Sequence, residues 1–247
     1  MDKNKLGAIV LAAGKGKRMN SRDINKVVLP LANKPMIVHS ISFLENVGIS
    51  QIVVVVGFAK KSVMEVLRTK VMFAEQHKRL GTGHAVVQGL KKLPREVENI
   101  LVINGDDSAF YTEEVIKNLA EKHLISNASL TFLTIDKQNP FGLGRVIRDE
   151  KENVKAIAEE KDATDVQRKV TEVNPGCYIF KSSFLRKYLP LVKKSPITGE
   201  YYLTSLIDVG IKNNEKIETL KAGSLPWRGV NTKDELLEAE RLFISTK

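Results

Sequence analysis

Cysteine, aromatic residues and long apolar runs are all scarce in this sequence of 247 residues. Cys177 is the only cysteine, so no disulfide can form within the chain, which suits a reducing cytoplasm. No apolar run reaches the ~18 residues that a membrane-spanning helix needs. The first apolar run follows Met1–Lys5 and leads directly into a glycine-rich loop, so it is not typical of a secretory signal peptide. We therefore expect a cytoplasmic protein with no membrane partner.

Negative charge is also in short supply, because 39 lysines and arginines face 29 aspartates and glutamates and leave a net charge of +10. Such an excess raises nucleic acid as a possible partner. The basic residues are scattered, however, and many of them form isolated pairs: Lys60-Lys61, Lys91-Lys92, Arg186-Lys187 and Lys193-Lys194. A nucleic-acid surface more often shows one long basic stripe with aromatic residues between, and aromatic residues are only 6% here. We interpret most of this charge as solvated helix faces and expect no nucleic-acid partner.

The most informative stretch that is present is the glycine-rich loop Leu11–Met19, which follows the apolar run Leu6–Val10. Its two glycines let the backbone turn tightly and approach a ligand where a Cβ would collide. The loop also carries three cations: Lys15, Lys17 and Arg18. A buried strand, a small-residue turn and a cationic helix start together form an anion site, because free backbone N–H groups and the helix dipole attract phosphate.

Two common nucleotide-binding loops are excluded by the spacing in this stretch. The dinucleotide-binding fingerprint needs a third glycine, and Met19 stands in its place. The Walker A loop needs Ser or Thr after Gly-Lys, and here Arg18 follows Gly16-Lys17. A phosphate-binding loop of another kind is therefore indicated.

Apolar strands alternate with helices through the first 135 residues, which predicts an α/β fold with a doubly wound, Rossmann-like sheet. We predict strands at 6–10, 51–57, 71–73, 99–106 and 128–135. We predict helices at 36–46, 61–69 and 82–90, and a further helix after the N-cap residue Thr112. Ligands of such sheets bind beyond the carboxyl ends of the strands, which is where the glycine-rich loop and Asp106 lie.

From Gly144 the pattern changes to shorter strands. We predict a hairpin of strands 145–148 and 154–157, a strand at 176–180, helices at 184–192 and 201–212, and a strand at 216–220. A capping box, Thr232-x-x-Glu235, opens the last helix. We expect a mixed sheet in one domain, 1–247, with an α/β first half at 1–135 and a β-rich insertion in the second half, at 136–247.

The motifs in order along the chain resemble those of the sugar-1-phosphate nucleotidylyltransferases, which join a nucleoside triphosphate to a sugar 1-phosphate and release pyrophosphate. The signature Leu-Ala-Ala-Gly-x-Gly-x-Arg-Met is present at the glycine-rich loop. The other matching pieces are Lys26, Leu80-Gly81-Thr82-Gly83-His84-Ala85, Gly105-Asp106, Gly142-Leu143-Gly144-Arg145, Glu159-x-Lys161-Asp162-Ala163, Glu172-x-Asn174-x-Gly176, Gly199-Glu200-Tyr201-Tyr202 and Gly229-Val230-Asn231. Together they look most like the pyrophosphorylase half of the bifunctional N-acetylglucosamine-1-phosphate uridylyltransferases.

The resemblance implies that residues 1–135 form a nucleotide-binding half and residues 136–247 a sugar-binding half, and it implies a role for each matching position. Arg18 and Lys26 would be the catalytic cations that bind the triphosphate, and Asp106 and Asn231 would hold Mg²⁺. The implied nucleotide-binding residues are Leu11, Ala12, Ala13, Gly14, Gly16, Gln76, Arg79, Gly81 and Thr82. The implied sugar-binding residues are Gly144, Glu159, Asn174, Tyr202 and Thr204. We interpret His84 as a hydrogen-bonded structural histidine and Asp107 as a turn residue.

Four positions depart from the family pattern. Asn25 stands where these enzymes often have a proline before the lysine, and we expect this change to loosen the loop. Pro175 follows Asn174 where a small hydroxyl residue is common, and Ser108 replaces a proline. Arg79 directly precedes Leu80-Gly81-Thr82-Gly83, where the uridylyltransferases carry a base-reading glutamine.

The expected substrates are a nucleoside triphosphate, with UTP leading, and a sugar 1-phosphate, with N-acetylglucosamine 1-phosphate leading. Because Arg79 has donors but no acceptor, CTP or dTTP stays open, as does glucose 1-phosphate. A non-catalytic regulator that binds a nucleotide sugar is the alternative from another class. The bifunctional relatives continue into an acetyltransferase made of hexapeptide repeats. Since no short repeat occurs in this sequence, we expect no acetyl transfer.

Overall fold

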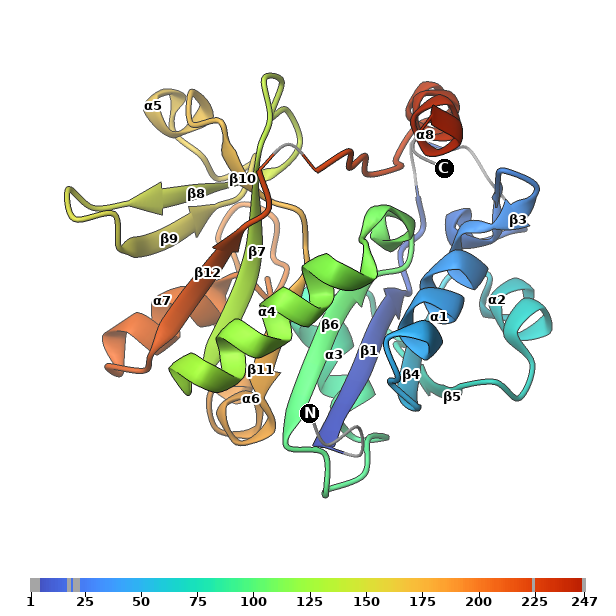
Figure 1. The fold of residues 1–247 in the computed structure, drawn as a ribbon, viewed down its shortest axis with the longest axis horizontal. Helices are drawn as coiled ribbons and strands as arrows, with labels where there is room; N and C mark the ends of the chain where they lie inside the picture. The colour runs from blue at the N-terminus through green and yellow to red at the C-terminus, as the bar shows by residue number, and fades with distance from the viewer. Residues whose placement is uncertain (1–4, 17–18, 20–22, 224, 246–247) are drawn as a thin grey trace.

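The computed structural model describes residues 5–16, 19, 23–223 and 225–245, and all structural statements here concern those residues (Figure 1). The strands are β1 (Leu6–Ala12), β2 (Pro30–Leu31), β3 (Lys34–Pro35), β4 (Gln51–Val56), β5 (Met72–Glu75), β6 (Asn99–Asn104), β7 (Leu130–Asp136), β8 (Gly144–Arg148), β9 (Val154–Ala158), β10 (Glu172–Asn174), β11 (Tyr178–Lys181) and β12 (Ile217–Lys221). The α-helices are α1 (Met36–Asn46), α2 (Lys60–Leu67), α3 (Thr82–Leu90), α4 (Glu113–Ser126), α5 (Asp165–Arg168), α6 (Ser182–Tyr188), α7 (Ser205–Lys212) and α8 (Lys233–Ser245). Short 3₁₀ turns are η3 (Lys26–Val28), η4 (Ser108–Phe110) and η5 (Leu189–Leu191). Within this described part of the chain, no helix has the length and apolar character needed to cross a membrane.

Ten of the described strands form a mixed sheet in the order β5–β4–β1–β6–β11–β7–β10–β8–β9, with β12 also paired to β7, while β2 and β3 form a separate two-stranded sheet. Strand β1 runs parallel to β4 and β6, with Ala8 opposite Ile52 on one side and Leu101 on the other. Strand β11 is antiparallel to both β6 and β7, and β10 and β8 continue the antiparallel part. The predicted mixed α/β sheet is therefore confirmed.

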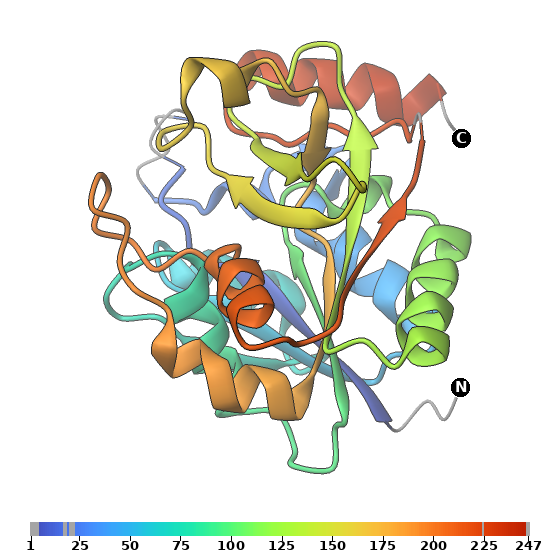
Figure 2. The same cartoon turned by 90° about the vertical axis from the view of Figure 1, so that its left-hand side faces the viewer.

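Helices cover both faces of this sheet, because successive side chains of a strand point to opposite faces. Ala8 and Val10 of β1 belong to a core shared with α1, α2, α4 and α8. Ile9, between them, belongs to a second core shared with α3, α6 and α7. Figure 2 shows α4 on one side of β7 and β12, and α6 and α7 on the other. Burial on both faces explains why the central strands are continuous apolar runs rather than alternating ones.

The predicted helix 201–212 is wrong at its start, since α7 begins at Ser205. The four residues before it are held by another segment of the chain. The backbone N–H of Tyr201 donates to the carbonyl of Leu80 at 2.7 Å, and its carbonyl accepts from the N–H of Gly83 at 2.8 Å. These long-range backbone bonds replace the helical ones and join the second half of the chain to the first.

Both predicted helix caps are present. The hydroxyl of Thr112 accepts from the N–H of Val115 at 3.2 Å and caps α4. At α8, the hydroxyl of Thr232 accepts from the N–H of Glu235 at 3.1 Å, and the Glu235 carboxylate accepts from the N–H of Thr232 at 3.0 Å. The same carboxylate accepts from the N–H of Asn231 at 2.6 Å, so the capping box also fixes the residue before it.

Candidate active site

A cavity of about 690 Å³ lies where the carboxyl ends of β1 and β6 meet the antiparallel strands of the second half. Both halves of the chain contribute to its wall, as the parallel-sheet rule for ligand sites leads one to expect. Its lining includes Leu11, Ala12, Ala13, Gly14, Gly16, Gln76, Arg79, Gly81 and Thr82 from the predicted nucleotide residues. It also includes Lys26, Asp106 and Asn231, and Gly144, Glu159, Asn174 and Thr204.

The glycine-rich loop leaves the end of β1 and packs on the segment that follows β4. The N–H of Phe58 donates to the carbonyl of Ala13 at 3.2 Å. A Cβ at Gly57 would lie 2.9 Å from that same carbonyl oxygen, so the two segments touch with no space for a side chain. Gly16 has φ +56°, in the region that glycine adopts without strain. Arg18 lies outside the described residues, and its predicted role stays a prediction.

The expectation that Asn25 loosens this loop is wrong. Asn25 is fully buried, and its amide nitrogen donates to the carbonyls of Ala12 at 2.9 Å and Phe58 at 2.8 Å. A side chain thus ties the loop down where a proline would make no hydrogen bond. These partners could not be predicted from local sequence, because they come from segments 13 and 33 residues away.

Three of the four predicted catalytic and metal residues meet at one point. The ammonium group of Lys26, in η3, pairs with the carboxylate of Asp106, which follows β6. It also donates to the amide oxygen of Asn231 and to the carbonyl of Val230, each at 3.0 Å. The Lys26 and Asp106 side chains are each 14% exposed, so this cation is largely screened from water by the protein.

The carboxyl group of Asp107 is a further charged group close to Asp106 and Lys26 of this cluster. Asp107 is in the predicted turn, but its side chain is buried and lines the cavity, which the sequence did not indicate. The amide of Asn104 donates to its Oδ2 at 3.1 Å, while Oδ1 has no hydrogen-bond partner among the residues that the structure describes. Burial raises the pKa of Asp107 well above its ordinary value, and the neighbouring Asp106 carboxylate raises it further. This environment favours the protonated form of Asp107.

Gln76 and Gly81 shape the wall beyond the glycine-rich loop. The buried Gln76 amide donates to the carbonyl of Gly81 at 3.0 Å and lies 3.0 Å from Nδ1 of His84. His84 therefore makes hydrogen bonds of the kind expected for a structural histidine. Gly81 has φ +102°, and a Cβ there would lie 2.5 Å from the carbonyl oxygen of Tyr201, so only glycine fits. Arg79 is exposed at the cavity wall.

Polar side chains of the second half line the opposite end of the cavity. The hydroxyl of Thr204 donates to Oε1 of Glu159 at 2.7 Å. Burial raises the pKa of Glu159, and this hydrogen bond offsets part of the effect. Asn174 donates to the hydroxyl of Tyr178, and its oxygen accepts from the N–H of Gly176 at 3.0 Å. These contacts hold the carboxylate and the amide in fixed positions at the cavity wall.

Tyr202 differs from the other predicted sugar residues. It is not among the residues that line the cavity, and its hydroxyl lies 2.7 Å from the hydroxyl of Thr198. Its neighbours Leu203 and Thr204 do reach the wall. The N–H of Leu203 donates to the hydroxyl of Thr82 at 2.9 Å, so this segment binds the nucleotide half directly.

A buried ion pair supports the loop that contains Gly142 and Gly144. The guanidinium of Arg145 lies 2.6 Å from Oε2 of Glu160, and that oxygen also accepts from the N–H of Gly142 at 2.9 Å. The Arg145 side chain is only 3% exposed and the Glu160 side chain 20%, so solvent reaches the pair only from the Glu160 side. Sequence reasoning included Arg145 in a motif without a role. The feature of the sequence that could have indicated this structural role is the position of Arg145 directly after two closely spaced glycines, Gly142 and Gly144.

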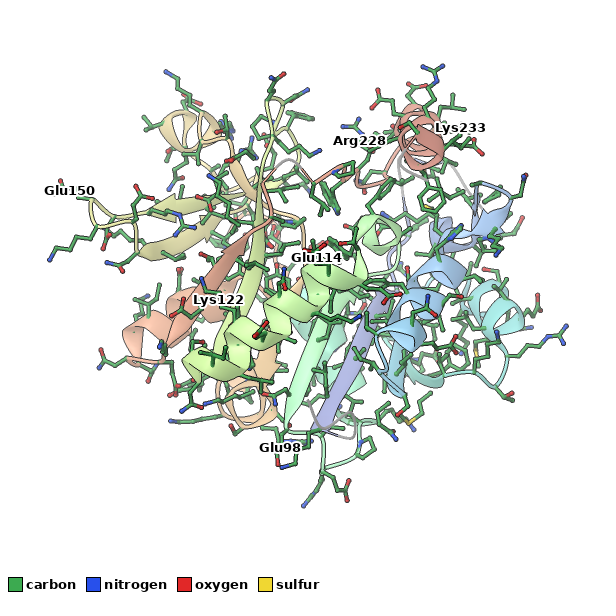
Figure 3. All side chains as sticks on the ribbon, viewed as in Figure 1. Glu98, Glu114, Lys122, Glu150, Arg228 and Lys233 are labelled. Atoms are coloured by element: carbon green, nitrogen blue, oxygen red, sulfur yellow. The ribbon has the colours of Figure 1, made fainter. Side chains whose placement is uncertain are left out.

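The segment before α8 positions Asn231 at the cavity. Lys137 donates to the carbonyl of Trp227 at 2.5 Å, and the Trp227 ring lines the cavity. The guanidinium of Arg228 lies 2.7 Å from Oε2 of Glu238 in α8, and Figure 3 shows Arg228 beside that helix. Together with the capping box, these contacts fix both sides of Gly229-Val230-Asn231. Trp227 was missed from the sequence, although it is the only tryptophan and stands two residues before this motif.

The sequence is similar to known proteins along most of its length. The nucleotidyl transferase family model matches residues 7–245. Bifunctional protein GlmU of Thermoanaerobacter pseudethanolicus is 37% identical over 238 residues, which cover 96% of this chain and 51% of that protein. The protein of the same name from Carboxydothermus hydrogenoformans is 39% identical over 212 residues, covering 86% and 47%. The chain thus spans about half the length of these curated relatives.

A solved structure shows the same fold. It is that of a Bacillus anthracis protein named as a glucose-1-phosphate thymidylyltransferase, in complex with a sucrose. The TM-score is 0.80, and the alignment covers 96% of this chain and 95% of that one. Because only 21% of the aligned residues are identical, this likeness is used for the fold alone.

Proposed function

The chain belongs to the nucleotidyl transferase family, and from that premise we propose that it joins a nucleoside triphosphate to a sugar 1-phosphate and releases pyrophosphate. UTP and N-acetylglucosamine 1-phosphate are the proposed pair. One observation carries the proposal. A single cavity connects the glycine-rich loop, the Lys26–Asp106–Asn231 cluster and the Glu159–Thr204 pair. Triphosphate, reacting centre and sugar would each have a fitting surface within it.

In the proposed reaction a phosphate oxygen of the sugar 1-phosphate attacks the α-phosphorus of the triphosphate, and the bond to the bridging oxygen of pyrophosphate breaks. The attacking oxygen is already anionic at neutral pH, so no general base is needed. Two anions must instead be brought together, and catalysis of this kind rests on positioning and on neutralising charge. We assign that task to Lys26, at the cavity wall, and to Arg18.

The oxygens around the Lys26 ammonium fit a divalent metal ion as well. Asp106, Asn231 and the carbonyl of Val230 present a carboxylate, an amide and a peptide oxygen to one cation. Mg²⁺ prefers such oxygen ligands and takes one or two carboxylates from a protein. We propose that Asp106 and Asn231 would hold Mg²⁺, which would supply positive charge for the developing pyrophosphate.

For the sugar, we propose that the Glu159 carboxylate accepts hydrogen bonds from hydroxyl groups and that the Asn174 amide accepts from them or donates to them. We also propose that the N–H of Gly144 donates to an acetamido carbonyl. Thr204 holds Glu159 in place. We include Tyr202 as a residue that supports this wall through Thr198. We further propose that the described halves act as one nucleotidyltransferase unit in the cytoplasm, where the buried thiol of Cys177 would stay reduced.

Another base is the second candidate, and the exposed Arg79 at the cavity wall favours it. Arginine has five donors and no acceptor, so it cannot receive the N3–H of uracil, whereas it can serve acceptor-rich edges such as N3 and O2 of cytosine. We therefore propose that UTP is used while CTP and dTTP are rejected only weakly.

The experiment is a matrix of triphosphates against sugar 1-phosphates, with pyrophosphate release and the nucleotide-sugar product measured in each cell. We expect the largest rate with UTP and N-acetylglucosamine 1-phosphate. Product formation with a different pair alone would replace the substrates but keep the reaction. If the protein binds a nucleotide sugar but no pair yields pyrophosphate, it is a regulator rather than an enzyme.

A further inference from the structure

Every hydrogen-bonding group of Asn25 has a partner within the protein. The amide nitrogen donates to the carbonyls of Ala12, Phe58 and, at 3.3 Å, Gly14, while the amide oxygen accepts from the N–H of Val27 at 3.2 Å. The backbone N–H donates to the hydroxyl of Ser62 at 3.1 Å, and the backbone carbonyl accepts from the N–H of Val28 at 3.1 Å. A fully buried amide with this many bonds is held in one orientation.

The partners of Asn25 belong to the two elements that the proposed reaction must hold in register. The first element is the glycine-rich loop, which contains Ala12 and Gly14. The second is η3, the turn that contains both Val27 and Lys26. The loop and the lysine also touch, because a Cβ at Gly16 would lie 3.3 Å from the Cβ of Lys26. The amide of Asn25 is therefore a direct link between the two.

The backbone alone does not call for asparagine at this position. Asn25 has φ −73° and ψ 142°, values that proline also adopts. A proline would keep this geometry but would lose the amide and the N–H that binds Ser62. The side chain, rather than the turn, is what distinguishes asparagine here.

We propose that Asn25 is a positioning residue for nucleotide binding: its amide holds the carbonyls of Ala12 and Gly14 so that the loop and the Lys26 ammonium keep a fixed separation. This inference rests on the proposed function of the cavity. It assigns Asn25 no contact with substrate. Its effect therefore falls on the nucleotide and not on the sugar, which is bound by residues of the other half.

The test compares Asn25→Ala, Asn25→Asp and Asn25→Pro with wild type. Ser62→Ala is the matched control, because it removes the partner of the Asn25 backbone N–H and the local bond of Ser62 to the carbonyl of Ala59, but leaves the Asn25 amide in place. Steady-state kinetics give KM for each substrate and kcat, calorimetry gives the nucleotide Kd, and thermal unfolding confirms that each variant is folded at the assay temperature. Aspartate is the sharpest change, because it keeps the size but turns the donor into an acceptor that faces carbonyl oxygens.

We expect the nucleotide KM and Kd to rise about 10- to 100-fold in the alanine and aspartate variants, with aspartate the worse of the two. The sugar 1-phosphate KM should stay at its wild-type value, Asn25→Pro should resemble alanine, and Ser62→Ala should resemble wild type. Equal increases in both KM values, unchanged nucleotide binding, or failure of all three variants to fold would each overturn the proposal. Wild-type protein that binds no triphosphate would instead contradict the proposed function.

Discussion

The two halves of the cavity differ in the groups that form its wall, which are mainly backbone groups in one half and mainly side chains in the other. In the nucleotide half, parallel strands present backbone: the glycine-rich loop, the Gly81 carbonyl and the close contact of Gly57 with Ala13. Buried amides, Asn25 and Gln76, hold that backbone in place. In the sugar half, antiparallel strands present side chains, and charged or strongly polar pairs hold them, such as Glu159–Thr204 and Arg145–Glu160.

This difference follows from what each half would bind in the proposed reaction. A triphosphate is an anion that backbone N–H groups and helix starts bind without sequence-specific side chains. A sugar presents many hydroxyl groups, which need donors and acceptors placed one by one. The nucleotide half should therefore be sensitive to the shape of its backbone, and the sugar half to the charge and hydrogen bonding of its side chains. Each prediction below acts on one side of this comparison.

The largest effect is expected where the halves meet. Asp106→Asn keeps the shape of the side chain but removes the charge that faces Lys26 and that would hold Mg²⁺. We expect kcat to fall about 100- to 1000-fold, while thermal stability and binding of each substrate alone persist. Asp136→Asn is the matched control, because Asp136 is the last residue of β7 as Asp106 closely follows β6, but it is exposed and pairs with Lys221. Near-native turnover of Asp106→Asn at saturating Mg²⁺ would disprove the metal assignment.

In the proposed nucleotide half, we expect a methyl group added at Gly81 to weaken nucleotide binding. A Cβ there would meet the carbonyl of Tyr201 at 2.5 Å in a backbone with φ +102°. We expect Gly81→Ala to raise the nucleotide KM about 10- to 100-fold. Gly223→Ala is the control, since Gly223 also has positive φ, +59°, but nothing lies near its Cβ position. Equal kinetics for both variants would show that backbone shape does not govern this half.

The sugar half should respond to the charge of Glu159. We expect Glu159→Gln to raise the sugar 1-phosphate KM about 10-fold and to leave the nucleotide KM unchanged, because a charge-assisted hydrogen bond is lost only on that side. Kinetics with each substrate varied in turn give the two values. A change in the nucleotide KM of the same size would contradict the division between the halves.

The same variant also tests how the titration of Glu159 makes the stability of the protein depend on pH. Burial raises the pKa of Glu159 above 4.5, so between the unfolded and folded pKa values the folded protein binds this proton more tightly. Its stabilising contribution is full below the unfolded pKa and is lost as pH rises through the folded pKa. Glutamine does not titrate, so Glu159→Gln should gain stability relative to wild type as pH rises through that window. Denaturant unfolding at a series of pH values measures this difference, and a difference that does not change with pH would contradict it.

The smallest expected effect concerns selection of the base. If Arg79 faces the base, Arg79→Gln should improve the preference for UTP over CTP by about 5-fold in kcat/KM, because an amide can accept the N3–H of uracil. Gln76→Ala, measured in parallel, asks whether the buried Gln76 reads the base or only supports Gly81. A wild type that already prefers UTP sharply, together with no change in Arg79→Gln, would remove Arg79 from base selection.

The sequence predicted the fold class, most helices and strands and both caps, because those features depend on residues close together in the chain. It also predicted Lys26, Asp106 and Asn231 as a group from the family motifs, and the structure brings them together. It did not predict where α7 starts, because the backbone of Tyr201 is hydrogen-bonded to Leu80 and Gly83, which are distant in the sequence. The contact between Leu203 and Thr82, 121 residues apart, belongs to the same junction.

Side-chain partners across long separations were likewise out of reach. Asn25 was expected to loosen the loop, and this was wrong. The residue type at a turn does not reveal which backbone carbonyls will surround its side-chain amide once that amide is buried. The burial of Asp107 was missed because a Gly-Asp-Asp turn is usually exposed, whereas here the Asp107 side chain is buried. In each case the missing information was three-dimensional packing rather than local pattern.

The most direct test of the central claim, that the two halves serve one substrate pair across one cavity, is calorimetric titration with UDP-N-acetylglucosamine and with UDP. In the proposed site the nucleotide sugar would span both halves, whereas UDP would reach only the first. We predict that wild type binds the nucleotide sugar more tightly than UDP, and that Glu159→Gln loses this advantage while its affinity for UDP stays the same. Equal affinity of wild type for the two ligands would contradict the account.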